Sequence, residues 1–301
     1  MFSTPVLFLV FNREDTAQKV FDAIKKQKPA KFYIAADGPR ENKEGEKERC
    51  QKVREIINQI DWDCEVKTLF REENLGCRRA VSSAISWFFE QEEMGIILED
   101  DCLPNTSFFF FCEEMLHKYK EDERIGHISG NSYFPELISA NQSYDFTTLP
   151  HIWGWATWKR VWKNYDVDFP YWTSKNNSSM RKRLFINKRE EIYFSSFLSD
   201  TLSKKHGINA WSPQYVFSLR LQNQLSIYPK VNMVTNIGLE DQEATHTSKK
   251  TNRTKALPQE EIKFPLEHPS YILRNKELDN KTTRKTFFSW KRLIRYILNN
   301  Y

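Results

Sequence analysis

The sequence predicts an α/β fold with a mixed, mainly parallel sheet flanked by helices. Three observations support this prediction. Apolar runs of strand length occur four times in the first hundred residues, segments with helical spacing separate them, and each run ends in polar or charged residues. Because a helix that crosses between two strands places them parallel, this alternation indicates a doubly wound sheet. The expected strands are 5–11, 32–36, 65–70 and 95–98.

The helices expected between these strands carry apolar residues three and four positions apart. We expect them at 16–26, 43–60 and 74–90. Later in the chain, the pattern predicts a helix at 108–119, a strand at 125–130, helices within 180–205, a helix from Pro213 and a strand at 225–233. Pro213 suits a first-turn position, where the amide hydrogen that proline lacks would be unpaired anyway. Residues 174–179 and 236–247 are polar and predict loops.

The fourth expected strand ends in three consecutive carboxylates, Glu99, Asp100 and Asp101. Like charges side by side at the end of a buried strand are costly unless a positive group sits there. A divalent cation with oxygen ligands is the simplest such group, and a metal held this way usually serves a phosphate. The alternative is an acidic surface turn after the strand, because acid pairs are common in loops.

Polar residues follow each of the four strands and predict one shared site. In a doubly wound sheet the ligand lies beyond the carboxyl ends of the strands, near the point where the strand order reverses. No GxxxxGK[ST] or GxGxxG motif is present, so phosphate binding would depend on a metal and basic side chains. The converging residues are Asn12 and Arg13, Asp37, Arg71 and Asn74, and Glu99 to Asp101.

The stretch HIWGWATWKRVW, residues 151–162, holds four Trp in twelve residues. Trp pairs a flat apolar face with an N–H donor, a combination that suits the faces and hydroxyls of sugars. The stretch therefore indicates a carbohydrate pocket, with ordinary core packing as the alternative.

Composition describes a globular protein of 301 residues, 40% hydrophobic and 28% charged. At roughly 100–200 residues per domain, this length allows one large domain or two smaller ones. The five Cys form no CxxC pair or zinc spacing, which favours a reducing compartment. The first apolar run is too short for a signal peptide or a membrane span, so we expect a soluble, cytoplasmic protein.

The positive charge gathers at the C-terminal end. The net charge is +5, and residues 247–301 contain 13 Lys and Arg against 5 Asp and Glu. Within them, 286–301 alternates apolar and basic residues at helical spacing. A basic amphipathic helix of this kind suits the anionic inner face of a membrane, although docking on the domain as an ordinary terminal helix is equally open. No nucleic-acid motif accompanies the charge, so we expect no nucleic-acid partner.

Six segments, taken in order, resemble a known family. They are PVLFLVFNR, AADGPR, NLGCRRAVSSAI, GIILEDDCLPN, HIWGWATW and NIGL followed by ATHT. Together they look like nucleotide-sugar glycosyltransferases of the GT-A fold, and are similar to bacterial polysaccharide-type members related to the N-acetylglucosaminyltransferase I group. The resemblance covers residues 4–247. It implies a catalytic domain at 1–247, with a nucleotide-binding half at about 1–130 and an acceptor half at about 131–247, followed by a basic extension at 248–301.

The resemblance implies roles on the nucleotide side of the site. Arg13, beside Asn12, falls where the family contacts the nucleotide, and Asp37 where an acid reads the uracil edge. The helix that borders the ribose and diphosphate would open at Asn74, Gly76 and Arg78. Asp101 matches the direct metal ligand, and Glu99 and Asp100 match residues that contact the ribose or ordered waters.

The resemblance also implies roles on the substrate side. The segment Trp153, Gly154 and Trp155 falls where the family shapes the donor-sugar and acceptor pocket, and Trp211 belongs to the same region. His246 falls in the closing loop near the diphosphate or metal. Oxygen-rich ligation suits Mn²⁺ or Mg²⁺.

The chain departs from the family at the catalytic base. An inverting transferase needs a general base near the acceptor hydroxyl, and the family carries a Trp-Asp pair where this sequence has Trp211 and Ser212. Serine does not accept a proton at neutral pH. Glu240 or Asp241 would then be the base, or the acceptor pocket has diverged.

The implied activity is metal-dependent transfer of a sugar, with inversion, from a nucleotide-sugar to a growing cell-surface glycan such as lipopolysaccharide. The donor is expected to be a UDP-sugar and the acceptor a glycan or lipid-linked glycan. Two alternatives stay open: a nucleotidyltransferase, which shares the α/β plan and the metal, and a degenerate protein that binds a glycan or nucleotide-sugar without catalysis.

Overall fold

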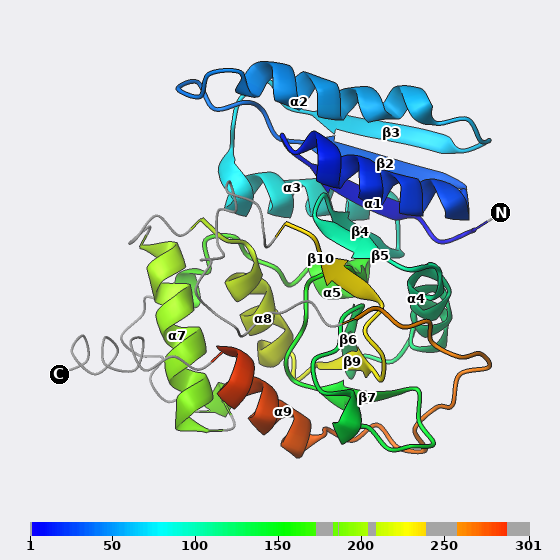
Figure 1. Ribbon diagram of the computed structural model, residues 1–301. Helices are drawn as coiled ribbons and strands as arrows, with labels where there is room; N and C mark the ends of the chain where they lie inside the picture. Colours follow the sequence, from blue (N-terminus) through cyan, green and yellow to red (C-terminus); the bar gives the residue numbers. More distant parts are fainter. Residues whose placement is uncertain (1, 173–182, 186, 204–208, 239–257, 288–301) are drawn as a thin grey trace.

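The computed structural model describes residues 2–172, 183–185, 187–203, 209–238 and 258–287. Its centre is an eight-stranded, mainly parallel sheet flanked by helices, as the sequence predicts (Figure 1). In spatial order the strands are β3 (Glu65–Phe70), β2 (Lys31–Ala36), β1 (Val6–Val10), β4 (Met94–Glu99), β8 (Trp155–Trp158), β6 (Ile125–Ser129), β9 (Leu225–Pro229) and β7 (Tyr144–Thr147).

The first four strands are all parallel. They are joined through α1 (Glu14–Gln27), α2 (Glu46–Arg54) with a 3₁₀ turn at Glu55–Gln59, and α3 (Gly76–Gln91). The chain steps outward from β1 through β2 to β3 and then returns to place β4 on the other side of β1. The strand order therefore reverses between β1 and β4, where a crevice forms beyond the strand ends.

The second half of the sheet is mixed. β8 runs antiparallel to both β4 and β6, β6 is parallel to β9, and β7 is antiparallel to β9. A separate two-stranded sheet pairs β5 (Cys102–Pro104) with β10 (Val234–Asn236). The remaining helices are α4 (Thr106–Lys118), α5 (Lys159–Trp162), α7 (Lys188–Leu202), α8 (Ser212–Leu221) and α9 (Lys276–Thr282), the last followed by a π-helical turn at Thr283–Phe287.

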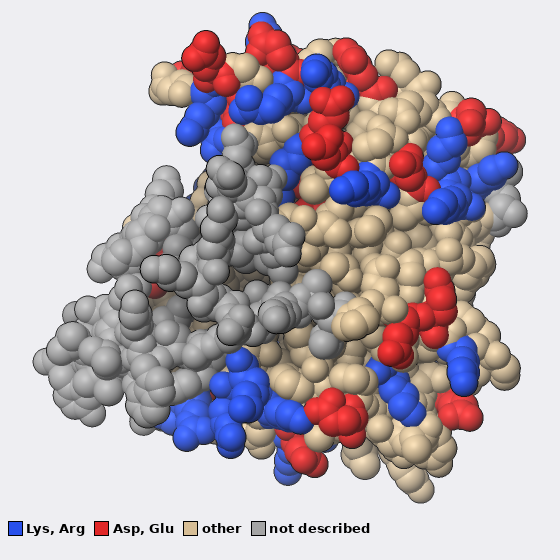
Figure 2. All heavy atoms as spheres, in the orientation of Figure 1, with Lys and Arg blue, Asp and Glu red and all other residues tan. Residues whose placement is uncertain are grey.

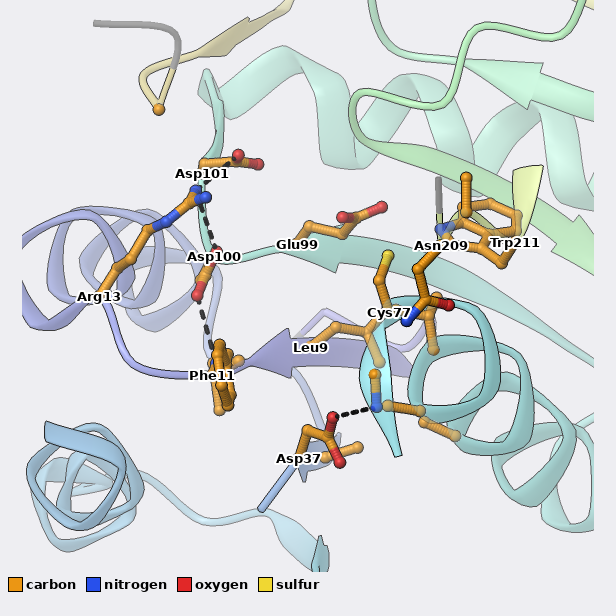
Figure 3. A pocket seen from close by; sticks show the side chains of 18 of the residues that line it. Leu9, Phe11, Arg13, Asp37, Cys77, Glu99, Asp100, Asp101, Asn209 and Trp211 are labelled. Atoms are coloured by element: carbon orange, nitrogen blue, oxygen red, sulfur yellow. Dashed lines mark hydrogen bonds and ion pairs between the residues drawn. The ribbon is translucent and has the colours of Figure 1, made fainter. Parts of the chain in front are cut away.

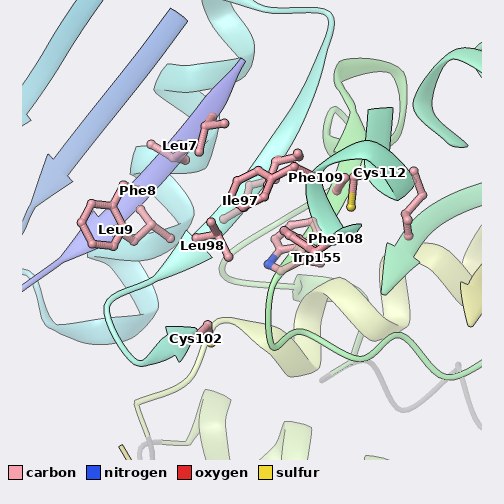
Figure 4. Packing of buried hydrophobic residues seen from close by; sticks show 14 of the residues in the cluster. Leu7, Phe8, Leu9, Ile97, Leu98, Cys102, Phe108, Phe109, Cys112 and Trp155 are labelled. Carbon is pink, nitrogen blue, oxygen red and sulfur yellow. The ribbon is translucent and has the colours of Figure 1, made fainter. Parts of the chain in front are cut away.

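The main core lies between the sheet and its helices. Leu7 of β1 and Ile97 of β4 are fully buried, and Phe108 and Phe109 of α4 pack on the same cluster (Figure 4). Burying side chains of this size contributes about 1.5–3 kcal/mol each. The apolar runs that form β1 and β4 are thus buried in this core, and their packing fixes the positions of the two strand ends.

A second core forms around α7 and α8, and a buried ion pair crosses it. Arg220 of α8 pairs with Glu190 of α7 at 2.5 Å, and both side chains are almost completely buried. The Arg220 guanidinium also lies 5.3 Å from the ring centres of both Phe185 and Phe194. This pairing fixes α7 relative to α8, which borders the crevice.

Residues 258–287 run from β5 and the start of α4 to the β7 edge of the sheet. Ser143 donates a backbone hydrogen bond to Glu267, and Asn275 donates one to Phe146 of β7, both at 2.8 Å. Ile262 and Leu266 are buried in the main core. The expected boundary after residue 247 lies outside the described residues, and so does the predicted helix 286–301 beyond its first two residues. No helix in the described ranges is both long and apolar enough to cross a bilayer.

Candidate active site

A cavity of about 500 Å³ opens beyond the carboxyl ends of β1 and β4 (Figure 3). It is lined by the loops after β1 and β2, the first turn of α3, the end of β4, and the start of α8. All the residues predicted to converge line it: Asn12, Arg13, Asp37, Arg71, Asn74, Glu99, Asp100 and Asp101. Four residues that the family resemblance implied also line it: Gly76, Trp153, Trp211 and Ser212.

The loop after β1 is bonded to the acidic end of β4. The Phe11 amide donates to the Asp100 carboxylate at 3.2 Å, and the Arg13 guanidinium donates to the Asp101 carboxylate at 3.0 Å. The same guanidinium lies 3.9 Å from Asp100. A hydrogen bond between charged groups is stronger than one between neutral groups, so these contacts fix the two strand ends against each other.

The acidic triplet concentrates negative charge. Burial raises the pKa of Glu99 to about 8, and the Asp101 and Asp100 carboxylates add to the shift, while the Trp211 indole and Arg13 oppose it. Figure 3 shows Glu99 directed toward Trp211 and Asp101 directed toward Arg13. A further cation beside the triplet would favour the ionised form of Glu99, because a nearby positive charge lowers the pKa of a carboxyl group.

The donor atoms present are compatible with a divalent cation, but they do not enclose one. Among the described residues, no group of three or more His, Cys, Asp and Glu side chains is arranged to hold a metal ion. The carboxylate oxygens at Asp101 suit Mg²⁺ or Mn²⁺, ions that commonly take their other ligands from water and a substrate phosphate. The second expected ligand, His246, lies outside the described residues.

Asp37 fixes the start of α3 at the cavity. Its carboxylate accepts hydrogen bonds from the backbone amides of Leu75 at 2.9 Å and Gly76 at 3.0 Å, and from the Asn74 side chain at 3.1 Å. A carboxylate is favourable there because the start of a helix carries unpaired N–H groups and partial positive charge. The structure therefore places Asp37, Asn74 and Gly76 together, with Asp37 capping the helix.

Asn209 is a cavity residue that sequence reasoning missed. Its side-chain oxygen accepts a hydrogen bond from the Arg78 amide at 3.1 Å. Gly76 has φ +74°, and a Cβ there would lie 2.2 Å from the Asn209 amide nitrogen. Glycine at position 76 thus provides the left-handed backbone and the space that Asn209 occupies.

Arg78 does not line the cavity, which corrects the role expected for its side chain. Its guanidinium is buried and points toward α7, where it donates to the Thr201 carbonyl at 3.5 Å and lies 3.9 Å from Asp168. Among the residues that the structure describes, the basic groups that line the cavity are Arg13, Arg40 and Arg71.

Arg40 is held at the cavity by Glu46, a residue that the sequence did not single out. Glu46 is fully buried and accepts hydrogen bonds from the Arg40 amide at 2.7 Å, the Arg40 side chain, and the Asn12 side chain at 2.9 Å. Burial alone would raise the pKa of Glu46, but the hydrogen bonds from Arg40 and Asn12 outweigh it and lower the pKa. The Arg40 guanidinium lies 5.6 Å from the centre of the Phe11 ring, and both side chains line the cavity.

The Trp-rich stretch divides between core and cavity. Trp153 lines the cavity, whereas Trp155 is 1% exposed and stacks on Trp211 at 5.4 Å and on His127 at 5.3 Å. Gly154 has φ +60° and packs on Val234, away from the cavity. Gly154 and Trp155 therefore do not form the expected pocket wall, because Trp155 lies in the buried strand β8 and Gly154, directly before it, is buried as well. Trp158 and Trp162 are also buried.

Trp211 and Ser212 lie at the start of α8 and complete the inner wall. The two carboxylates proposed to replace the missing base, Glu240 and Asp241, lie outside the described residues.

The segment that leads to those carboxylates begins at the acidic triplet. The Ile237 amide donates to the Asp101 carbonyl at 2.8 Å. A Cβ on Gly238 would lie 2.8 Å from both the Arg13 guanidinium and the Asp101 carboxylate. The β5–β10 pair therefore places Gly238 directly against the Arg13–Asp101 contact.

No known protein-family model matches the chain, and no curated protein sequence matches it. Solved structures do match at low similarity. TarS 1-349 from S. aureus is 11% identical, covers 71% of each chain and superposes with a TM-score of 0.36. HddC from Yersinia pseudotuberculosis is 10% identical, covers 55% of this chain and 80% of its own, and has a TM-score of 0.34.

A third match is the structure of a protein named as a putative glucose-1-phosphate thymidylyltransferase from Bacillus anthracis, which is 9% identical to this chain. That match covers 53% of this chain and 73% of the other, with a TM-score of 0.33. Likenesses of this degree do not assign an activity to the chain.

Proposed function

We propose that the protein is a metal-dependent glycosyltransferase that moves a sugar from a nucleotide-sugar to a growing glycan or lipid-linked glycan. The expected donor is a UDP-sugar. The observation that carries this proposal is the Arg13–Asp101 contact of 3.0 Å at the reversal of strand order, inside a cavity of about 500 Å³. A crevice at this point of an α/β sheet is a common place for a nucleotide. The ordered sequence motifs favour sugar transfer among the reactions such a crevice supports.

The charged half of the cavity suits the nucleoside diphosphate. Arg13, Arg40 and Arg71 line this half and supply donors for phosphate oxygens. Phe11 offers an aromatic face beside Arg40 on which a base can stack. Asp37 already accepts the amides at the start of α3, so the phosphate donors are the three arginines and not this helix end.

Sugar transfer breaks the bond between the anomeric carbon and the diphosphate through an oxocarbenium-like transition state. Negative charge then develops on the departing diphosphate, and Arg13 is placed to stabilise it. A bound Mn²⁺ or Mg²⁺ beside Asp101 would supply further charge neutralisation. Contact with Asp101 keeps the Arg13 guanidinium oriented before the substrate arrives.

The aromatic half of the cavity suits the sugar and the acceptor. Trp153, Trp211 and Phe197 line this half, and such side chains pack on sugar faces. Ser212 cannot act as the base in an inverting reaction, so we assign that role to Glu240 or Asp241 on the segment that begins at Gly238. The acceptor is a cell-surface glycan, consistent with the bacterial polysaccharide-type enzymes that the sequence resembles.

Donor hydrolysis tests this proposal without knowledge of the acceptor. The protein is incubated with UDP-, GDP- or dTDP-sugars and Mn²⁺ or Mg²⁺, and the released nucleoside diphosphate is measured by chromatography. We expect slow release from one donor class that needs the metal, and a loss of at least tenfold in Asp101→Asn but not in Asp63→Asn, an exposed acid outside the cavity. No release from any donor, or release that is indifferent to Asp101, would contradict the proposal.

The same assay separates the alternatives. A nucleotidyltransferase would release pyrophosphate from a nucleoside triphosphate and a sugar phosphate. A protein that only binds would show saturable binding of the nucleotide-sugar without release of the diphosphate.

A further inference from the structure

A second cavity, of about 650 Å³, lies between the start of α7 and the α9 helix with its π-helical turn. Five of the side chains that line it are basic: Lys188, Arg189, Lys281, Arg284 and Lys285. We call these five residues the basic cluster. It lies apart from the catalytic cavity and has no part in the proposed reaction.

Acidic side chains offset part of the basic cluster, and Glu277 also lines the cavity. Lys188 pairs with Glu191 at 3.0 Å, and Lys281 pairs with Glu136. Arg284 and Lys285 are exposed and form no ion pair with any residue that the structure describes. A face with unpaired guanidinium and ammonium groups attracts an anionic surface.

The helices that carry the basic cluster are held in place by buried contacts. Leu278 and Asp279 of α9 are fully buried, and the Asp279 carboxylate accepts a hydrogen bond from the Thr148 side chain at 3.0 Å and pairs with Arg274. The Asn187 side chain donates to Asn280 at 3.0 Å and joins the start of α7 to α9. The basic groups from the two helices are therefore held on one side of the molecule. Figure 2 shows Lys and Arg side chains gathered at the lower edge of this view, in the region of α9.

We propose that the basic cluster docks the protein on a membrane surface rich in anionic phospholipids. A lipid surface fits because the charge is spread over two helices and a turn, whereas a free phosphate would need donors converging on one point. After Lys285 the chain continues as TFFSWKRLIRYILNNY, whose sequence alternates basic and apolar residues in the manner of interfacial helices. This proposal holds whatever reaction the catalytic cavity performs.

Vesicle sedimentation of the full-length protein tests the proposal. Vesicles of phosphatidylglycerol mixed with phosphatidylcholine are compared with vesicles of phosphatidylcholine alone, at low and high salt. Each basic residue near an anionic surface contributes about 1 kcal/mol, so Arg284→Glu combined with Lys285→Glu is expected to weaken binding at least tenfold. Binding of the unaltered protein should require phosphatidylglycerol and should fall at high salt because salt screens the charges.

The matched control is Lys19→Glu with Lys26→Glu, two exposed lysines of α1 with the same total charge change. We expect this control to bind like the unaltered protein, and thermal unfolding to be the same for both variants. Equal binding by the Arg284/Lys285 variant, equal loss in the control, or binding to phosphatidylcholine alone would overturn the proposal. Absence of binding to either kind of vesicle would overturn it as well.

Discussion

Glu46 organises one side of the cavity at the ends of β1 and β4 although it does not line it. Its buried carboxylate bonds to both Arg40 and Asn12, which do line it. Nothing in the sequence marked this glutamate, because a charged residue at the start of a charged helix is ordinarily assigned to the surface. It is a positioning residue for the proposed nucleotide site.

Glu46→Gln is predicted to weaken nucleotide-sugar binding. The Gln amide has one acceptor oxygen and no charge, so it cannot accept the hydrogen bonds from Arg40 that the carboxylate accepts. Hydrogen bonds to charged groups contribute about 1.5–3 kcal/mol. We expect KM for the donor to rise about tenfold or more while kcat changes less. Steady-state kinetics and thermal unfolding measure this, with exposed Glu48→Gln as the control. An unchanged KM would show that Arg40 does not need Glu46.

Gly238→Ala is predicted to disturb the Arg13–Asp101 contact without unfolding the protein. The new methyl carbon would lie 2.8 Å from both side chains, which must then separate. We expect nucleotide affinity in the presence of metal to fall about tenfold with little change in the unfolding temperature. Isothermal titration and thermal unfolding test this together, and unchanged affinity would mean that the contact is dispensable.

At the scale of elements, the sequence predicts the first half of the sheet well. Strand 65–70 is predicted and found although only three of its six residues are apolar, because the helical segments on either side of it are regular. The strands β5, β7, β8 and β10 were missed. Each has three or four residues, and a strand this short is formed by its partners rather than by its own pattern.

The site was predictable where it follows strand ends and unpredictable where it depends on contacts between distant segments. Arg13 and Asp101 come directly after β1 and β4, so topology alone brings them together. Asn209 reaches Gly76 through contacts across more than a hundred positions of the chain, and no local pattern reports such a contact. The sequence predicts Trp155 in the pocket wall, but β8 is buried on both faces, so its tryptophans pack in the core.

Glu190→Gln is predicted to loosen α7 from α8. Removing one member of a buried ion pair leaves the other charge unpaired, at a cost of about 3–5 kcal/mol, and the Arg220 contact is buried on both sides. Urea unfolding measures the loss. Glu93→Gln, whose exposed carboxylate pairs with the half-exposed Lys159, is the control and should cost about 1 kcal/mol or less. Equal effects of the two changes would contradict this account.

At the scale of the whole molecule, two buried histidines make stability depend on pH. His127 of β6 and His151 are buried in the interior. Burial lowers the pKa of each from 6.5 to about 3, and proximity to His127 contributes further at His151. The folded protein therefore keeps both rings neutral at pH values where the unfolded chain binds protons.

Stability is predicted to fall as the pH decreases from 6.5 toward 5, and the raised pKa of Glu99, which favours the folded protein at lower pH, offsets part of this loss. In this window the unfolded chain takes up protons that the folded protein excludes, which costs up to about 1.4 kcal/mol per pH unit for each histidine. Urea unfolding between pH 7.5 and 5 measures this, and His127→Asn should reduce the slope. A free energy of unfolding that stays constant across the window would refute the prediction.

The central claim is that the cavity at Asp101 binds a nucleoside diphosphate together with a divalent cation. Isothermal titration of UDP into the protein with Mn²⁺ tests it most directly, using Asp101→Ala and, as control, Asp63→Ala. The account predicts one binding site that needs the metal, at least tenfold weaker in Asp101→Ala and unchanged in the control. Absence of binding with Mn²⁺ or Mg²⁺, or binding that Asp101→Ala leaves unaltered, would contradict it.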